Sequence, residues 1–486
     1  MKLTAFPILS EFVCSVILCT TLASGAAFSE PLETTTATET VSLQQLFEHY
    51  QKTHPAFTST EHRNRLAENS LSSIKSGNDW NFSINSRYFK RESSREISNS
   101  AGTLLEVSDY ENSSHSIRLR KRLWDLGASV SISQSYRRYP NNLSEHDNDL
   151  SINFDMPLWR GRGGLNYKSS YDSMELSAKS TSLSVEDQRE SLLGSLGARF
   201  VRWFYAEELH QIRKQHLEQL NQLKSRANRE ISQREQLYFK HAIQTNNQEL
   251  ALTHTRLNSI KEALSQYAQM PNISSASPSY DLYEIKTLPD VANKNAIHNT
   301  RIVQIVDIQG KILQNRIKVA TDDLNPFLSL SLSQTYSGSD SEFDQSYDFD
   351  SESYSLMLRL NRPIENNSAK TRLESVKIQQ QMQKDGEQNL ELNLTAGLLD
   401  LTGQLKGLST AMSSKNQELN TASELMENEI SLFIKNKLDI SIVLSTLNRF
   451  IESKLEYADM ATEYQTRYLS YQTLTDQLWQ PNKKPE

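Results

Sequence analysis

Two long stretches of this sequence lack proline, and they constrain the fold more than any single motif. No proline occurs between Pro157 and Pro271 or between Pro363 and Pro481, and both stretches are poor in glycine. Proline removes a backbone hydrogen bond and clashes with the preceding turn of a helix. Both stretches can therefore be helical throughout, and each follows a strand-like segment that ends at a proline. We expect a duplicated unit with very long helices.

The N-terminal segment is typical of a secretory signal. A basic residue is followed by an apolar run and then by small residues, which is the order found in cleaved signal peptides. We assign residues 1–29 to a signal peptide and the Thr-rich residues 30–41 to a linker. Both cysteines, Cys14 and Cys19, fall in the signal, so the mature chain would form neither a disulfide nor a thiolate metal site.

The charge and hydropathy of the chain exclude two classes of protein. The formal net charge is −7, which argues against a nucleic-acid partner because nucleic-acid-binding domains are usually basic. Beyond the N-terminus, no run approaches the ~20 apolar residues of a membrane-spanning helix. A location in a membrane would therefore require a closed β-barrel.

The first unit is predicted to span residues 42–270. Helical periodicity gives way to alternating apolar and polar residues, which indicate strands, and a polar loop is expected at about 92–112. The long helical hairpin of this unit reverses near 228–235. In order, the unit comprises a helix from the N-cap Ser42 to about Gly77, strands between about 80 and 158, and a helical hairpin at about 165–269.

The second unit is predicted to span residues 290–480, after a linker at 271–289 and before a short tail at 481–486. It repeats the order of the first unit with fewer strands, and its long hairpin reverses near 436–439. The two reversals lie at nearly equal distances from the opening prolines, which supports duplication. In order, the unit comprises a helix near 290–322, strands at about 327–362 and a helical hairpin at about 366–480.

Six candidate strands share one pattern, with apolar residues on one face and Ser, Asn or Arg on the other. In one of them, Ile117 and Leu119 alternate with Arg118 and Arg120. Strands of about ten residues with this alternation are typical of transmembrane barrels, although the strands of a soluble sandwich alternate in the same way. Long polar loops that alternate with tight turns, and aromatic residues near strand ends, favour the barrel.

The long helical stretches contain apolar residues at intervals of three and four, the spacing of a packing seam. His216 lies in one such seam, and we interpret it as a packing residue rather than a metal ligand.

This order of elements behind a signal peptide resembles the TolC family of outer-membrane efflux proteins, over about residues 42–480. The segment Pro157-Leu158-Trp159-Arg160-Gly161-Arg162-Gly163 looks like the barrel-to-tunnel junction of that family. The junction residues that the resemblance implies are Pro157, Trp159, Gly161, Gly163 and Pro363.

The two predicted reversals resemble the periplasmic tip of the same family. Asn436 stands where the family usually has glycine, and asparagine tolerates left-handed backbone angles better than most residues. Ile442 and Ser445 fall where well-known members place two aspartates, so an acidic selectivity ring is not expected, and Asp439 is the nearest acid. The implied tip and gate residues are Ser232, Glu235, Phe433, Asn436, Lys437, Asp439, Ile442 and Ser445.

The resemblance implies an α+β membrane protein. Duplicated helix–strands–long-helical-hairpin units would build a trimeric transmembrane β-barrel that continues into a long periplasmic α-helical barrel. A homotrimer would sit in outer-membrane lipid with a large periplasmic portion, and its partners would be a periplasmic adaptor (membrane fusion) protein and an inner-membrane transporter. The chain would be the channel-tunnel component of a tripartite efflux or type I secretion system, conducting substrate passively and without a cofactor.

The number of strands leaves the size of the barrel open. The four-strand first unit is similar to a subgroup of the family with an extra β-hairpin. A trimer would have eighteen strands if the hairpin joins the wall, and the usual twelve if it does not.

Enzymatic function is not predicted. The sequence lacks the His-Glu-x-x-His, Gly-x-Ser-x-Gly and phosphate-loop motifs, and it indicates no metal or cofactor site. The alternative reading is a secreted trimeric coiled-coil stalk or adhesin with a β-rich head. That reading accounts for the long helices and the signal peptide, but not for the matched spacing of the two reversals.

Overall fold

The computed structural model describes residues 40–99, 102–140, 145–226, 232–287 and 295–480. All of them belong to one compact unit. The predicted signal peptide, most of the linker at 30–41 and the tail at 481–486 therefore lie outside the described residues.

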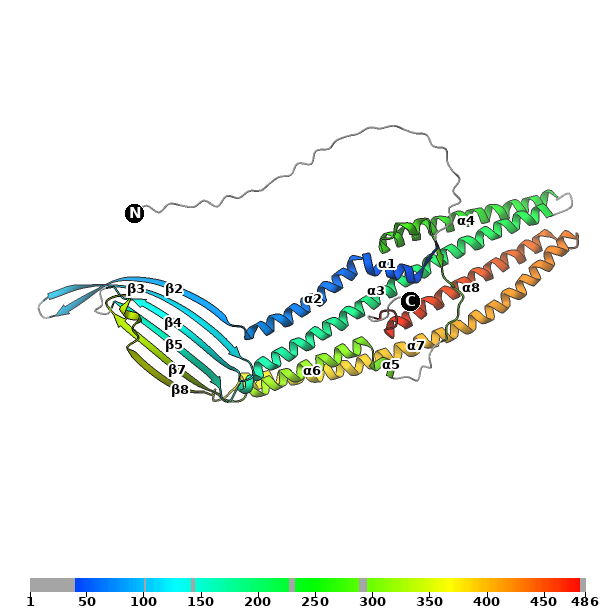
Figure 1. Cartoon of the computed structure of the whole chain (residues 1–486). Coiled ribbons are helices and arrows are strands. Elements are labelled where there is room, and N and C mark those ends of the chain that lie inside the picture. Colours follow the sequence, from blue (N-terminus) through cyan, green and yellow to red (C-terminus); the bar gives the residue numbers. More distant parts are fainter. Residues whose placement is uncertain (1–39, 100–101, 141–144, 227–231, 288–294, 481–486) are drawn as a thin grey trace, which may run out of the picture. The chain divides into compact units, whose positions relative to one another are not determined.

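Six strands form one antiparallel sheet in the order in which they occur along the chain (Figure 1). β5 pairs with β7, so strands from both halves of the chain share this sheet. Residues 113–138, the segment predicted as an extra hairpin, lie within the sheet as the paired parts of β3 and β4. The strands are β2 (Asn81–Asn99), β3 (Gly102–Leu123), β4 (Ala128–Arg138), β5 (His146–Pro157), β7 (Phe327–Asp340) and β8 (Ser351–Asn361).

The predicted polar loop at about 92–112 is wrong, because the backbone there continues as paired strand. β2 runs to Asn99, which pairs with Gly102 at the start of β3. The apolar alternation that identifies a half-buried strand is lost in this region, whereas strand pairing requires only backbone hydrogen bonds. The register also places Lys90 opposite Glu111, and cross-strand pairs of opposite charge stabilise a sheet.

The sheet has one apolar and one polar face. Side chains alternate between the faces of a strand, and the register aligns mostly apolar residues on one face and polar residues on the other. One row of the apolar face is Phe82, Leu119, Ile132, Ile152, Gln334 and Tyr354, and the adjacent row of the polar face is Ser83, Arg118, Ser133, Ser151, Thr335 and Ser353. The apolar face is open to solvent in the single chain, as Phe82 (60% exposed) and Leu356 (73% exposed) show.

Four long helices form two hairpins (Figure 1). α2 and α4 pack along α3, while α6 and α8 pack along α7, and α3 also contacts α6 and α8. None of the described helices combines the length and the apolar character needed to cross a membrane. The helices are α1 (Leu43–Thr53), α2 (Pro55–Lys75), α3 (Leu165–Arg226), α4 (Gln233–Ala268), α5 (Asn295–His298), α6 (Arg301–Asp322), α7 (Asn367–Ile434) and α8 (Ile440–Leu474).

The helix predicted from Ser42 to about Gly77 is divided in two. Ser42 is the expected N-cap and forms a capping box with Gln45. α1 ends before His54, and Pro55 occupies the first turn of α2, where proline is tolerated because that N–H has no helical partner. The ring nitrogen Nδ1 of His54 accepts a hydrogen bond from the N–H of Ala56 at 3.2 Å and so caps the second helix.

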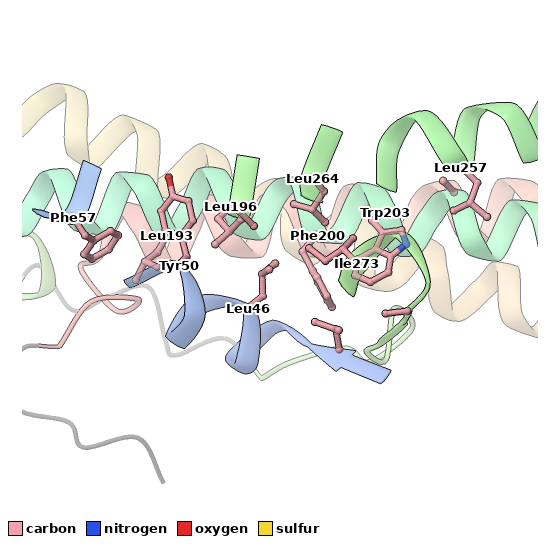
Figure 2. Close-up of a cluster of buried hydrophobic side chains, with 14 residues drawn as sticks. Leu46, Tyr50, Phe57, Leu193, Leu196, Phe200, Trp203, Leu257, Leu264 and Ile273 are labelled. Carbon is pink, nitrogen blue, oxygen red and sulfur yellow. The ribbon is translucent and has the colours of Figure 1, made fainter. Parts of the chain in front are cut away.

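The predicted linkers are structured where the chain is described, and they contribute to the core. β1 (Thr40–Ser42) pairs in parallel with β6 (Ser277–Ser279). This pairing cannot be predicted from local sequence patterns, because the two strands are far apart in the sequence. Val41 and Ile273 are buried. Figure 2 shows the cluster that they join, formed largely by Leu46, Tyr50, Phe57, Leu193, Leu196, Phe200, Trp203, Leu257, Leu264 and Ile273.

A buried ion cluster fastens the end of the chain to α3 and α6. The guanidinium of Arg301, the first residue of α6, lies 3.2 Å from Glu186 and 3.2 Å from Glu190 on α3, and 3.3 Å from Asp476. The backbone N–H of Arg301 also donates to Asp476 at 2.6 Å, and its guanidinium donates to the carbonyl of Trp479. Two N–H groups, of residues 478 and 479, donate to Glu190 in return.

Candidate functional site at the helical tip and the strand-to-helix junction

The reversal between α7 and α8 is a tight turn centred on Asn436. α7 ends at Ile434, and Asn436 adopts the left-handed conformation, with φ 57°. The N–H of Asn436 donates to the carbonyl of Phe433 at 2.9 Å, and that of Lys437 donates to the carbonyl of Leu432 at 2.9 Å. This pair of bonds is the Schellman motif, in which glycine is the usual left-handed residue. Asparagine serves here because it tolerates that conformation.

Three of the predicted tip residues begin the returning helices. Asp439 is the N-cap of α8 and accepts a hydrogen bond from the N–H of Ser441 at 2.8 Å. Ser232 caps α4: its hydroxyl accepts from the N–H of Glu235 at 3.3 Å, and Glu235 accepts from the N–H of Ser232 at 2.9 Å. Side chains that satisfy these otherwise unpaired N–H groups determine where a helix starts. Residues 227–231 of the first reversal lie outside the described part.

The remaining tip candidates divide into buried and exposed side chains. Phe433 is 1% exposed and packs edge-on against Phe239 of α4, with 6.5 Å between ring centroids. This contact joins the two hairpins near their turns. Ile442 is 47% exposed, and Lys437 and Ser445 are also exposed, so these three side chains are available for contacts outside the chain.

A hollow of about 510 Å³ lies between α3, α4 and the start of α8. His216 on its wall is only 4% exposed, and its Nδ1 lies 3.0 Å from the side-chain oxygen of Asn246. Its Nε2 has no hydrogen-bond partner within the described residues. Burial lowers the pKa of the imidazole to about 4, so His216 packs as a neutral ring. The polar lining comprises Arg213, His216, Tyr238, His241, Thr245, Asn246, Glu249, Ser441, Ser445, Asn448 and Glu452.

Replacing His216 and Asn246 together by leucine should make the protein less sensitive to acid. The pKa of His216 is about 4 in the folded state against an ordinary value of 6.5, so the unfolded chain binds a proton that the folded chain excludes. The stability from the neutral ring is present above pH ~6.5 and is lost as the pH falls toward 4, where the loss reaches ~3 kcal/mol. The thermal midpoint of the wild type should therefore fall further between pH 7 and pH 4 than that of the double variant. An equal fall in both proteins would contradict this assignment.

Four of the five predicted junction residues lie where β5 ends and α3 begins. Pro157 is the last residue of β5, and Trp159 is 50% exposed. Gly161 and Gly163 have φ of 79° and 63°, a region in which residues with a Cβ are strained. The N–H of Gly161 donates to Asp322 at the end of α6 at 2.6 Å. This hydrogen bond therefore connects the segment after β5 to α6, the helix that precedes β7.

Two further glycines make this junction close-packed, and the predicted set omits them. A Cβ on Gly164 would lie 1.7 Å from the carbonyl oxygen of Trp124, and one on Gly127 would lie 2.8 Å from the carbonyl oxygen of Gly161. The turn between β3 and β4 therefore docks directly against the start of α3. Gly127 is recognisable in the sequence as a turn residue. Its packing against Gly161 and Gly164 is not, because that contact joins segments distant in sequence. Pro363, the counterpart after β8, is exposed.

The described residues offer no metal centre, since they contain no group of three or more His, Cys, Asp or Glu placed to hold an ion. The candidate functional features are thus the two turns, the hollow beside α8, and the junction. They lie in a fold that combines a six-stranded meander sheet with long helical hairpins.

The fold of this chain is similar to those of several solved outer-membrane proteins, among them CmeC, MtrE and VceC. The CmeC outer-membrane channel of Campylobacter jejuni is 11% identical with a TM-score of 0.65, over 91% of this chain and 87% of that one. The MtrE outer-membrane channel of Neisseria gonorrhoeae, in its open state, is 12% identical with a TM-score of 0.65, over 90% and 89%. The outer-membrane protein VceC of Vibrio cholerae is 12% identical with a TM-score of 0.64, over 89% and 95%. No family model and no curated protein sequence matches the chain. The fold is that of an outer-membrane channel.

Proposed function

We propose that this chain is a TolC-family outer-membrane channel that conducts substrate passively out of the cell and is not an enzyme. The observation that carries the proposal is the near-complete likeness of fold to solved outer-membrane channels, which covers about nine-tenths of both chains. A periplasmic adaptor and an inner-membrane transporter would supply the substrate and the energy at the helical tip. The predicted signal peptide is consistent with export to the outer membrane.

We propose that three copies close one barrel of eighteen strands. The sheet has six strands in antiparallel order, so its edge strands β2 and β8 run in opposite directions. β8 of one copy can therefore pair antiparallel with β2 of the next, and the pattern continues around the ring. Open strand edges are not tolerated in lipid, and the apolar face would meet the lipid while the polar face lines the pore. Assembly is then a requirement of folding.

We also propose that the chain arose by duplication of one unit. α2 (21 residues) precedes the first strands and α6 (22 residues) precedes the second. The returning helices, α4 with 36 residues and α8 with 35, are similarly matched. Each unit would contribute one helical hairpin to the tunnel wall, so that three copies supply six hairpins.

Membrane fractionation and conductance test the proposal. The full-length protein, expressed in a Gram-negative host, should remain in the sarkosyl-insoluble outer-membrane fraction and migrate as a trimer in native electrophoresis. Purified trimers should give discrete conductance steps in planar bilayers. Release of the protein by salt or urea, together with a lack of conductance, would contradict the channel and support a secreted coiled-coil stalk.

Ile442→Ala should increase leakage through the tip. Ile442 is 47% exposed in the single chain and lies in the first turn of α8, where the copies would meet in a closed tunnel. Burying an isoleucine contributes ~1.5–3 kcal/mol, so truncation should raise the open fraction about tenfold. The measurement is uptake of a normally excluded antibiotic, with trimer yield as the check on folding. Leu392→Ala, another truncation of a large aliphatic side chain, at a 70% exposed position in α7, is the control, and equal leakage in both variants would contradict a gate at the tip.

A further inference from the structure

The polar face of the sheet is basic, although the chain as a whole is acidic. The register assigns more arginines than aspartates to this face among the side chains that the structure describes. The arginines are Arg87, Arg91, Arg118, Arg120, Arg122, Arg137 and Arg359, and the aspartates are Asp147, Asp149 and Asp155.

The aspartates are already engaged. Asp155 and Asp147 on β5 each accept a hydrogen bond from a serine hydroxyl of β7, both at 2.6 Å. Asp149 accepts one from Ser337 at 2.7 Å and is also paired with Arg137. Asp149 and Arg137 neutralise each other, whereas Asp147 and Asp155 keep their negative charge while they accept these hydrogen bonds. The arginines of this face therefore still outnumber its unpaired aspartates.

Three arginines on the polar face of one strand have no such partner among the described residues. We call Arg118, Arg120 and Arg122 of β3 the arginine row. All three are exposed, and no carboxylate of the described residues lies within 4.0 Å of any of them. Arg120 donates to the hydroxyl of Ser129 at 3.2 Å, and the guanidinium of Arg122 lies over the ring of Tyr167. Both contacts are with uncharged groups, so the positive charges remain unneutralised.

The register explains why the arginine row stays unpaired. On β4, Arg118, Arg120 and Arg122 face Ser133, Ser131 and Ser129. On β2, Arg118 and Arg120 face Ser83 and Asn81. The aspartates of β5 are two strands away, roughly 10 Å at the ~4.8 Å spacing of strands. Residues on one face of a strand repeat every ~6.7 Å, so the arginine row spans about 13 Å along β3. It ends at Arg122, next to the β3–β4 turn that packs against the start of α3.

We propose that the arginine row makes the pore prefer anions, and that its substrates carry a carboxylate or a comparable anionic group. This inference rests on the proposed function, because it requires the polar face to line the pore. Three copies would place nine guanidinium groups around the wall at the entrance from the tunnel to the barrel. Guanidinium groups bind carboxylates through paired hydrogen bonds, and rings of arginine select anions in pores. Low-dielectric walls concentrate their field within the channel.

Reversal potentials in planar bilayers test the proposal. With wild-type trimers in a KCl gradient around 0.1 M, the reversal potential should have the sign of chloride preference. In a variant with Arg118→Gln, Arg120→Gln and Arg122→Gln, the ratio of chloride to potassium permeability should fall by at least about threefold. The difference between the two proteins should shrink near 1 M salt, where the screening length is only about 3 Å.

A charge-conserving variant is the matched control. Replacing the same three residues by lysine keeps the charge and should keep the chloride preference, whereas a merely structural role for arginine would make the lysine and glutamine variants alike. Cation preference in the wild type, or the same permeability ratio in the wild type and the glutamine variant, would overturn the inference. A lack of any conductance from wild-type trimers would instead contradict the proposed function itself.

Discussion

Replacing Arg301 by alanine is expected to lower the free energy of unfolding by ~3–5 kcal/mol, the range for removing one partner from a buried ion cluster. The side chain of Arg301 is 9% exposed and bridges Glu186 and Glu190 on α3 to Asp476. Without the guanidinium, the carboxylate of Glu190, at 1% exposed, would remain buried with only two backbone N–H groups as partners. The measurement is the thermal midpoint of the detergent-purified protein, followed by circular dichroism.

The loss should grow as the pH rises. Burial raises the pKa of Glu190 and of Asp187, and Arg301 acts against that rise at both groups. A carboxyl with a raised folded-state pKa contributes stability that is fully present below its ordinary value, 4.5 for Glu190, and is lost as the pH rises through the folded pKa. Removing Arg301 raises both pKa values further. Arg301→Ala should therefore be closer to the wild type in stability at pH 5 than at pH 8.

Two further variants distinguish the effect of this buried ion cluster on stability from the effect of an exposed ion pair. Adding Glu190→Gln to Arg301→Ala should recover part of the loss at pH 8, because an amide replaces the unpaired buried charge. Lys311→Ala on the same helix removes an exposed pair with Asp307 and should change stability by less than about 1 kcal/mol. The interpretation is wrong if Arg301→Ala behaves like Lys311→Ala, or if its deficit is independent of pH.

Gly164→Ala is expected to disrupt the strand-to-helix junction. Gly164 has φ of 71°, which costs a residue with a Cβ on the order of 1–3 kcal/mol. The added methyl group would lie 1.7 Å from the carbonyl oxygen of Trp124. The carbonyl is a backbone group, and the backbone of residue 164 fixes the position of its Cβ, so relief requires the β3–β4 turn to move, at a further cost of about 1–3 kcal/mol. We expect a lower thermal midpoint and faster proteolysis near residues 124–127 and 158–165.

The neighbouring glycine provides a matched control. Gly163 has a similar φ of 63°, but a Cβ there would meet no atom within 4 Å. Gly163→Ala should therefore incur the backbone strain alone, on the order of 1–3 kcal/mol, and leave the turn protected from protease. Similar proteolysis of the two variants would show that the turn does not dock against Gly164 in solution.

Local features of the sequence predicted much of this architecture because their physical causes are local. The alternation in Leu328 to Leu332 places side chains on opposite faces of a strand whatever that strand pairs with. Ser232 and Asp439 cap helices through their own neighbouring N–H groups, and Asn436 adopts the left-handed turn conformation by its own preference. The strands beyond Arg91 escaped prediction because their residues lack apolar alternation, while the pairing depends on the backbone of the partner strand.

The proline-free stretches by themselves determined that this chain would form very long helices, and the turn and cap residues determined where those helices reverse. Only the tertiary structure decided that Arg301 contacts Glu190, more than a hundred residues away in the sequence, and that Gly164 has no room for a side chain. It also decided that serine and asparagine residues of β2 and β4 face the arginine row. The physical reason is common to all three. Charge pairing and close packing depend on which groups approach in space, whereas helix formation and capping depend on neighbours along the chain.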